Sequence, residues 1–181
     1  LAATFVNWLK AKKDPRLSIL SGGVNGDMSF DAQKGLPNGL DATTVQTVPG
    51  FKGGNVMVEF SIINPKLLDD DESYVFMNYS EAEFLLAEAA QRNIGGATDA
   101  AGHYAKGVKA ALHQYADAYK MLVSGNYVTD PGLVISDADA NAYVTANPYA
   151  GLESIGEQMW ASKFLNWWDA WSDWRRTGFP K

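Results

Sequence analysis

The C-terminal stretch of this 181-residue sequence carries a stripe of aromatic side chains that restricts the possible folds. The positions that recur at steps of three and four residues are Trp160, Phe164, Trp167, Trp171 and Trp174. Such spacing places all five rings on one face of a helix, and each ring can bury roughly 150–250 Å². Aromatic rings at helical spacing usually belong to a core. We therefore predict that the stripe is packed, either against earlier helices or against polypeptide outside this sequence.

The end of this helix is also predictable. Arg175 and Arg176 lie in the last turn, where cations interact favourably with the negative end of the helix dipole. Gly178 and Pro180 then end the helix.

Composition indicates an ordinary globular chain of single-domain size, with 46% hydrophobic and 20% charged residues. The formal net charge of −6 and the absence of a basic stripe argue against a nucleic-acid-binding surface. There is no cysteine, which excludes disulfides, thiolate catalysis and zinc–thiolate sites. No apolar run approaches the roughly 18 residues that span a bilayer, and no signal peptide is present. Because the sequence begins at Leu1 rather than Met, we expect a processed product or a fragment.

The N-terminal third is predicted to be a short helix followed by a long irregular region. Residues 2–12 show helical spacing, and Asp14-Pro15 ends that helix. From Ser21 to about Asn64 the chain holds eight of its 17 glycines, so we expect loops. Two further segments, 17–20 and 56–62, are predicted to be short strands.

The second half is predicted to be helical. Ser80 and Glu83 have the spacing of a capping box, which begins a helix that ends at Gly95-Gly96. A second helix opens at Thr98-Asp99 and continues through apolar positions at helical spacing: Tyr104, Val108, Leu112, Tyr115, Tyr119 and Leu122. The short connection makes the two an antiparallel helical hairpin. A third helix begins at Ser136 and ends before Pro148, and a fourth runs from near Leu152 toward the tryptophan stripe.

Several of these segments resemble the SusD/RagB group, the SusD-like nutrient-binding lipoproteins of the Bacteroidetes outer membrane. The helix at 78–90 matches a family pattern of Tyr, Ser, Glu, then Phe-Leu and Ala-Glu-Ala. Residues 104–112 and 135–143 are similar to the helices that follow, and Asp14-Pro15-Arg16 matches a tripeptide after a family helix. The ending, 157–181, resembles the family's C-terminal signature almost residue for residue.

This resemblance implies a mostly α, SusD-like fold with a tetratricopeptide-like helical hairpin, a long irregular Gly-rich region and at most short strands. It further implies that residues 1–181 are the C-terminal portion of a single SusD-like domain. In that portion, residues 1–79 would form the short helix and loop region, and residues 80–181 the helical region. The lipid anchor of the family is absent from this chain, so membrane attachment would come from elsewhere in the protein.

Catalysis and metal binding have little support in the sequence. Glu81, Glu83 and Glu88 supply carboxylates on one helix, as glycosidases require, but Glu83 is explained by the capping box. His103 and His113 are ten residues apart rather than the four of a helical zinc pair. The acidic run 69–72 has the oxygen ligands that calcium prefers but not the spacing of an EF-hand, so we expect a solvated run. We predict no enzyme activity, no metal and no cofactor.

Glycan binding is the function that the resemblance implies, with hand-over to a SusC-like TonB-dependent transporter on the cell-surface side of the outer membrane. Sugar sites combine aromatic faces with amide and carboxylate groups, and the Gly-rich region supplies both. The candidate ligand-binding residues are Asn25, Asp27, Phe30, Asn38, Phe51 and Asn55. Each is also an ordinary turn residue. Two alternatives stay open: binding of a peptide or another nutrient in the same system, or a helical docking scaffold with no ligand of its own.

Overall fold

The computed structural model describes residues 1–68 and 74–181, and the chain divides into two compact units. Unit 1 comprises Leu1–Glu72 and unit 2 comprises Ser73–Lys181. The predicted mostly α fold is confirmed, because helices are the main regular structure of both units and the described residues contain one two-stranded sheet. None of the described helices has the length and apolar character needed to cross a membrane. The predicted acidic run 69–72 lies outside the described residues.

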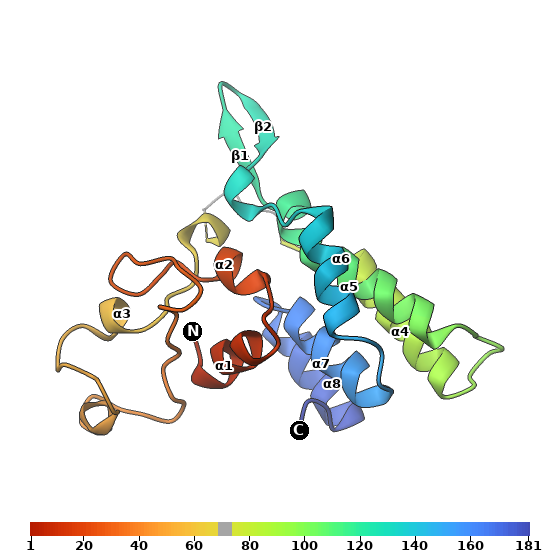
Figure 1. Cartoon of the computed structure of the whole chain (residues 1–181), viewed down its shortest axis with the longest axis horizontal. Coiled ribbons are helices and arrows are strands. Elements are labelled where there is room, and N and C mark those ends of the chain that lie inside the picture. Colours follow the sequence, from red (N-terminus) through yellow and green to blue (C-terminus); the bar gives the residue numbers. More distant parts are fainter. Residues whose placement is uncertain (69–73) are drawn as a thin grey trace. The chain divides into compact units, whose positions relative to one another are not determined.

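Unit 1 consists of a small core of short helices and long irregular segments (Figure 1). Its elements are α1 (Ala3–Ala11), α2 (Arg16–Leu20), the 3-10 helices η1 (Thr44–Thr47) and η2 (Pro65–Leu67), and α3 (Val56–Glu59). The side chains that fill the core are Val6, Leu9, Leu17, Leu20, Phe60 and Leu67. The predicted N-terminal helix and the long irregular region are therefore both present.

Two predicted strands in unit 1 are wrong, because both segments are short helices. At 17–20, the carboxylate of Asp14 accepts the backbone N–H of Arg16 at 2.9 Å, and Pro15 supplies a backbone angle suited to a helix start. At 56–62, the side chain of Asn55 caps α3 by accepting the N–H of Met57 at 2.9 Å. In both places a polar side chain just before the apolar run overrides its weak strand pattern.

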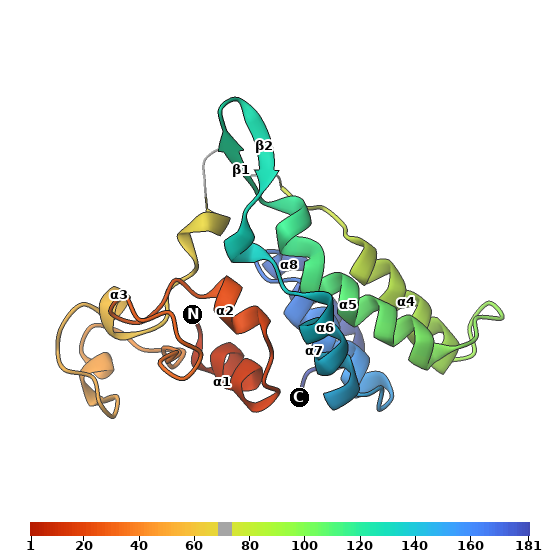
Figure 2. The same ribbon diagram turned by 45° about the horizontal axis from the view of Figure 1, so that its top comes forward.

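Unit 2 is built on α4 (Tyr79–Gln91) and α5 (Ala100–Ala118), which lie side by side in both views (Figures 1 and 2). This confirms the predicted helical hairpin. Tyr104, Val108, Leu112 and Tyr115 are buried as their spacing predicts. Gly107 allows the close approach of the helices, since a Cβ there would lie 2.8 Å from ring carbons of Phe84.

The start of α4 differs from the predicted capping box. Asn78 is the N-cap, and its side chain accepts the N–H of Glu81 at 2.8 Å. The helix therefore begins two residues before the predicted start, and Ser80 is buried in its first turn, where its hydroxyl donates to Gln114 at 3.2 Å. Glu83 makes different contacts, described below.

The segment after α5 forms a hairpin of β1 (Lys120–Val123) and β2 (Asn126–Thr129), which the sequence reading missed. Leu122, predicted to lie on the buried face of the second helix, is in β1 and is exposed. The turn residues Ser124 and Gly125 both have positive φ, as two-residue hairpin turns favour. The next helix, α6 (Asp137–Ala146), follows the 3-10 helix η3 (Pro131–Leu133) and is capped by Ser136, as predicted.

The predicted fourth helix is two helices, α7 (Leu152–Ser162) and α8 (Trp167–Thr177). The chain turns between them, where Leu165 adopts a φ of 72° and the N–H of Asn166 donates to Lys163 at 2.9 Å. The helix end at Gly178 is confirmed by its φ of 75°.

This break also corrects the predicted aromatic core. Phe164 is buried and Trp160 is half-buried, but Trp167, Trp171 and Trp174 are exposed, and α8 contains no buried residue. The turn at 163–166 rotates α8 so that a different side of the helix faces the described body of unit 2.

Candidate ligand-binding surfaces

The first candidate surface is a turn of the Gly-rich region that contains two predicted ligand-binding residues, Asn25 and Asp27. Asn25 has a φ of 49° and is exposed, and its N–H donates to the carbonyl of Val58 at 2.7 Å. Asp27 is exposed and accepts the N–H of Ser29 at 2.9 Å. Hydrogen bonds from the side chain and backbone of Ser29 lower the pKa of Asp27, so the carboxylate is ionised at neutral pH.

The bond to Val58 brings this turn beside α3, whose N-cap Asn55 is a third predicted residue. Asn55 is exposed, and its side-chain oxygen is already used by the cap. Amide and carboxylate groups of Asn25, Asp27 and Asn55 thus flank one short segment, which we call the Asn25 turn surface. Groups of this kind can exchange hydrogen bonds with the hydroxyls of a sugar or the backbone of a peptide.

The remaining predicted residues do not join this surface by any described contact. Phe51 is half-buried and stacks on the core residue Phe60, with ring centroids 5.9 Å apart. Phe30 is half-buried, and its carbonyl accepts the N–H of Gln33. Asn38 is exposed, and its side chain makes no hydrogen bond to the described residues. Of the aromatic candidates, Phe51 therefore has a clear packing role.

A second candidate surface, not predicted from the sequence, is the aromatic side of α8. Its four indole rings are at least half exposed: Trp167 56%, Trp168 79%, Trp171 51% and Trp174 50%. The guanidinium of Arg175 lies 4.6 Å from the ring centroid of Trp171. Exposed indole rings are the side chains that pyranose faces and apolar protein surfaces both prefer. The sequence showed this concentration of tryptophan, but helical spacing cannot tell which surface a stripe will meet.

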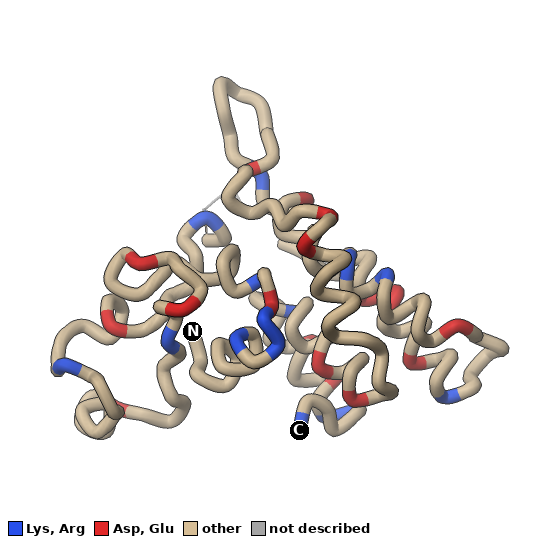
Figure 3. The backbone as a smooth tube through the Cα atoms, viewed as in Figure 1, with Lys and Arg blue, Asp and Glu red and all other residues tan. Residues whose placement is uncertain are grey.

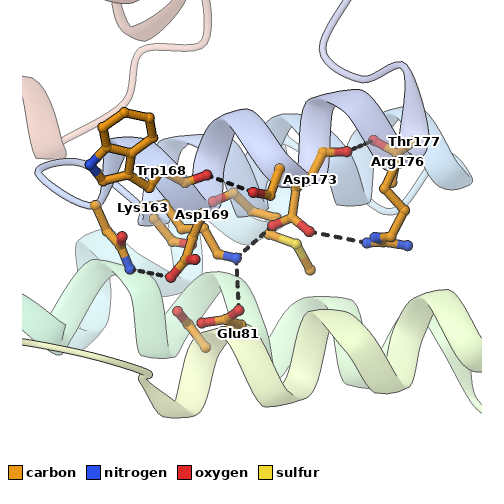
Figure 4. A network of polar contacts seen from close by, with 12 residues as sticks. Glu81, Lys163, Trp168, Asp169, Asp173, Arg176 and Thr177 are labelled. Carbon is orange, nitrogen blue, oxygen red and sulfur yellow. Dashed lines mark hydrogen bonds and ion pairs between the residues drawn. The ribbon is translucent and has the colours of Figure 1, made fainter.

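The opposite side of α8 is held to α4 by a network of ion pairs (Figure 4). The ammonium of Lys163 lies 2.7 Å from Glu81 and 2.5 Å from Asp173, and its side chain is only 4% exposed. Burial would lower the pKa of Lys163, but the hydrogen bonds that its ammonium donates to Asp173 and Glu81 raise it on balance, so the amine is charged.

A second part of this network joins Arg176 to Glu88. The guanidinium makes two bonds to the carboxylate, at 2.6 and 2.8 Å, and Arg92 adds a third at 2.8 Å. Hydrogen bonding to Arg176 lowers the pKa of Glu88. The carboxylates of Glu81 and Glu88, weighed above as catalytic groups, are thus ion-pair partners that fix α8 on α4.

Glu83 also has partners in unit 2. It accepts hydrogen bonds from the hydroxyl of Tyr79 and from Nδ1 of His103, the latter at 2.7 Å. Burial raises the pKa of Glu83, whereas these two bonds lower it, and the net effect is a lowered pKa. The Glu83–His103 contact thus joins α4 to α5. His113 is not part of it, since its Nε2 lies 3.3 Å from the carboxylate of Asp137.

Basic and acidic residues are both spread over the described parts of each unit (Figure 3). No run of Lys and Arg marks a nucleic-acid surface within the described parts of either unit. Neither candidate surface therefore has the electrostatic character of a polyanion site.

The whole chain, residues 1–181, matches a family described as SusD-like, starch-binding and associating with the outer membrane. No curated protein matches in a sequence comparison. Among solved structures, a chitin-binding protein aligns with a TM-score of 0.76 and 29% identity over 99% of this chain and 38% of its own.

Two other solved structures align over 99% of this chain. A SusD homologue from Bacteroides fragilis gives a TM-score of 0.65 at 24% identity, with 40% of its own length covered. A Bacteroidetes SusD-like protein gives 0.74 at 21% identity, with 43% covered. The chain thus spans 38–43% of the length of these proteins.

Proposed function

The chain belongs to the SusD-like family of starch-binding proteins that associate with the outer membrane, and we propose that it takes part in binding a glycan without altering it. The observation that carries this proposal is the family match across all 181 residues. The family is one of binding proteins, in agreement with the predicted absence of catalysis. The similarity to a chitin-binding protein at 29% identity supports a polysaccharide or its oligosaccharides as the ligand class.

Within this proposal, the Asn25 turn surface is the place where the chain contacts its ligand. Its side chains are exposed, and its backbone is fixed by the Asn25–Val58 bond and by the Asn55 cap, so little order would be lost on binding. Asn38 would add a further polar group. Stacking on Phe30 or Phe51 would require the half-buried rings to offer one face to the sugar.

In the proposed mechanism, the protein captures the glycan and hands it over to a transporter. The neutral amides exchange hydrogen bonds with the glycan and one carboxylate accepts them, so the glycan is held reversibly, with no covalent bond broken, at the cell-surface side of the outer membrane. A SusC-like TonB-dependent transporter would then receive it. The lipid anchor that attaches such proteins to the membrane would lie outside these residues.

The test is affinity electrophoresis of the complete natural protein against soluble starch, glycol chitin and other polysaccharides, followed by calorimetry with oligosaccharides of the retarding glycan. Asn38→Ala and Asn25→Gly are the informative variants. Asn38 has no side-chain hydrogen bond within the described residues, and glycine preserves the positive φ of position 25. We expect each to weaken binding by about tenfold, as loss of a ligand hydrogen bond does.

Asn141→Ala is the matched control, since Asn141 is exposed on α6, far along the chain from the turn. Its affinity should equal that of the natural protein. Unchanged affinity in both test variants would place the ligand elsewhere, and retardation by no glycan would refute glycan binding. Release of reducing sugar would refute the non-catalytic mechanism.

A further inference from the structure

Helix α8 has its polar and aromatic sides reversed with respect to the described body of unit 2. Arg176 pairs with Glu88 of α4, and Asp173 pairs with Lys163 at the end of α7, which in turn pairs with Glu81 of α4. The indole of Trp168 lies on the side of α8 away from α4 (Figure 4). A surface helix normally turns its apolar side inward, so the arrangement indicates that α8 has a second neighbour.

The aromatic surface is large enough to be an interface. We define it as the α8 aromatic face, formed by Trp167, Trp168, Trp171 and Trp174, all at least half exposed. Rings of this size expose together on the order of 400 Å². That area matches the largest apolar patch of a typical soluble monomer, and such patches often serve as interaction sites. Because the ion pairs fix the opposite side of α8, the helix cannot simply rotate to bury these rings.

The chemistry of the face favours polypeptide over sugar as its neighbour. Polar groups beside the rings are already bonded: the hydroxyl of Ser172 donates to the Trp168 carbonyl, and Asp169 accepts from Asn166 at 2.6 Å. Few groups remain to bind sugar hydroxyls. In contrast, Trp167, Trp171 and Trp174 have the i, i+4, i+7 spacing by which one helix packs against another.

The similar solved proteins supply the identity of that neighbour. The alignments cover 99% of this chain but only 38–43% of those proteins. Their SusD-like folds therefore contain polypeptide that these 181 residues do not. We propose that the α8 aromatic face docks on an apolar helical surface of that remaining part of the fold, within the same molecule. This inference depends on the geometry of α8 and not on the proposed glycan.

Oxidative footprinting of the complete natural protein tests this without any substitution. Hydroxyl radicals oxidise exposed Trp and Met, and peptide mass spectrometry compares each residue in the native and urea-unfolded protein. Met159, 2% exposed, is the buried reference, and Met57, 63% exposed, is the open one. We expect Trp168 and Trp171 to lose reactivity on folding to the level of Met159.

Three results would overturn the proposal. The rings would react like Met57 if the face were open. Protection that disappears on dilution would identify a second copy as the neighbour. Protection that appears only with added starch or chitin oligosaccharide would identify a sugar platform.

A substitution gives an independent measurement. Trp168 is the most exposed of the four rings, so contacts within these 181 residues predict no effect of Trp168→Gln. Docking predicts a fall in Tm of about 3 °C in the complete protein. Tyr127→Gln is the control, because Tyr127 is a similarly exposed aromatic residue on β2. Equal Tm values for both variants and the natural protein would contradict docking.

Discussion

At the scale of single residues, the ion pair of Asp14 and Arg16 anchors the turn between α1 and α2. Both side chains are fully buried, and Arg16 bonds the carboxylate through Nε at 2.9 and 3.1 Å and Nη2 at 2.5 Å. Asp14→Asn keeps the shape but leaves a buried cation without its counter-charge. We expect a loss of about 3 kcal/mol in the free energy of unfolding, measured with urea.

The exposed Asp31 provides the control for this change. Asp31→Asn should alter stability by no more than about 0.5 kcal/mol. If the two variants proved equally mild, the pair would contribute far less than its burial indicates.

Gly107 carries a second prediction at this scale, since it sets the spacing of α4 and α5. An added Cβ would lie 2.8 Å from two ring carbons of Phe84, which is itself fully buried. Alanine in an exposed helix position would stabilise by roughly 1 kcal/mol relative to glycine. Here we expect Gly107→Ala to destabilise by about 2 kcal/mol, because overpacking forces the ring or the helix to move.

A double variant separates the clash from other effects. Phe84→Leu makes room for the new methyl group, so Gly107→Ala should cost less in that background, as measured by thermal unfolding. Stabilisation by Gly107→Ala in the natural background would show that the helices can separate freely.

At the scale of secondary-structure elements, the attachment of α8 to α4 should depend on pH through Glu88. Bonding to Arg176 lowers the folded-state pKa of this carboxyl below its unfolded value of about 4.3. The contribution to stability is therefore complete above the unfolded pKa and is lost as pH falls through the folded pKa. Glu88→Gln should reduce stability at neutral pH and flatten its decline below about pH 4.3.

Urea unfolding between neutral and acidic pH measures this dependence. Glu153→Gln, an exposed change in the first turn of α7, should leave the acid part of the curve unchanged. Since Arg176 is 45% exposed, solvent screening limits the effect, and salt should weaken it further. Parallel curves for Glu88→Gln and the natural protein would exclude Glu88 as the titrating group.

The elements with strong local signals were predictable from the sequence. Ser136 caps α6 as expected, and the α4–α5 hairpin follows from helical spacing and the glycines between them. The short elements were not predictable, because the first turns of α2 and α3 depend on backbone N–H groups that donate to the side chains of Asp14 and Asn55, against a strand-like pattern. The β1–β2 hairpin was missed because Tyr119 and Leu122 extend the helical spacing beyond the end of α5.

At the scale of the whole molecule, the sequence predicted only part of the core and only part of the candidate site. Helical spacing predicted that the tryptophans share a face, but burial depends on which surface meets that face, and this is not encoded in α8 itself. The six ligand-binding candidates remain predictions. The structure groups Asn25, Asp27 and Asn55 around Val58, whereas Asn38, Phe30 and Phe51 have no described contact with that group. Turn residues carry no periodic signal, so their grouping required the fold.

The net charge of the chain gives the last prediction. With a charge of −6 and no basic stripe, long-range attraction cannot drive ligand capture, unless the ligand is a cation. We therefore expect binding to a neutral polysaccharide, with an affinity that is nearly constant between about 0.01 and 1 M salt, although the Debye length falls from about 30 to 3 Å. Calorimetry across this range measures it, with heparin as the polyanionic control that should not bind. A steep fall in affinity with salt would show instead that charged groups, such as Asp27, supply most of the binding energy, and would favour a cationic ligand such as a deacetylated amino sugar or a basic peptide.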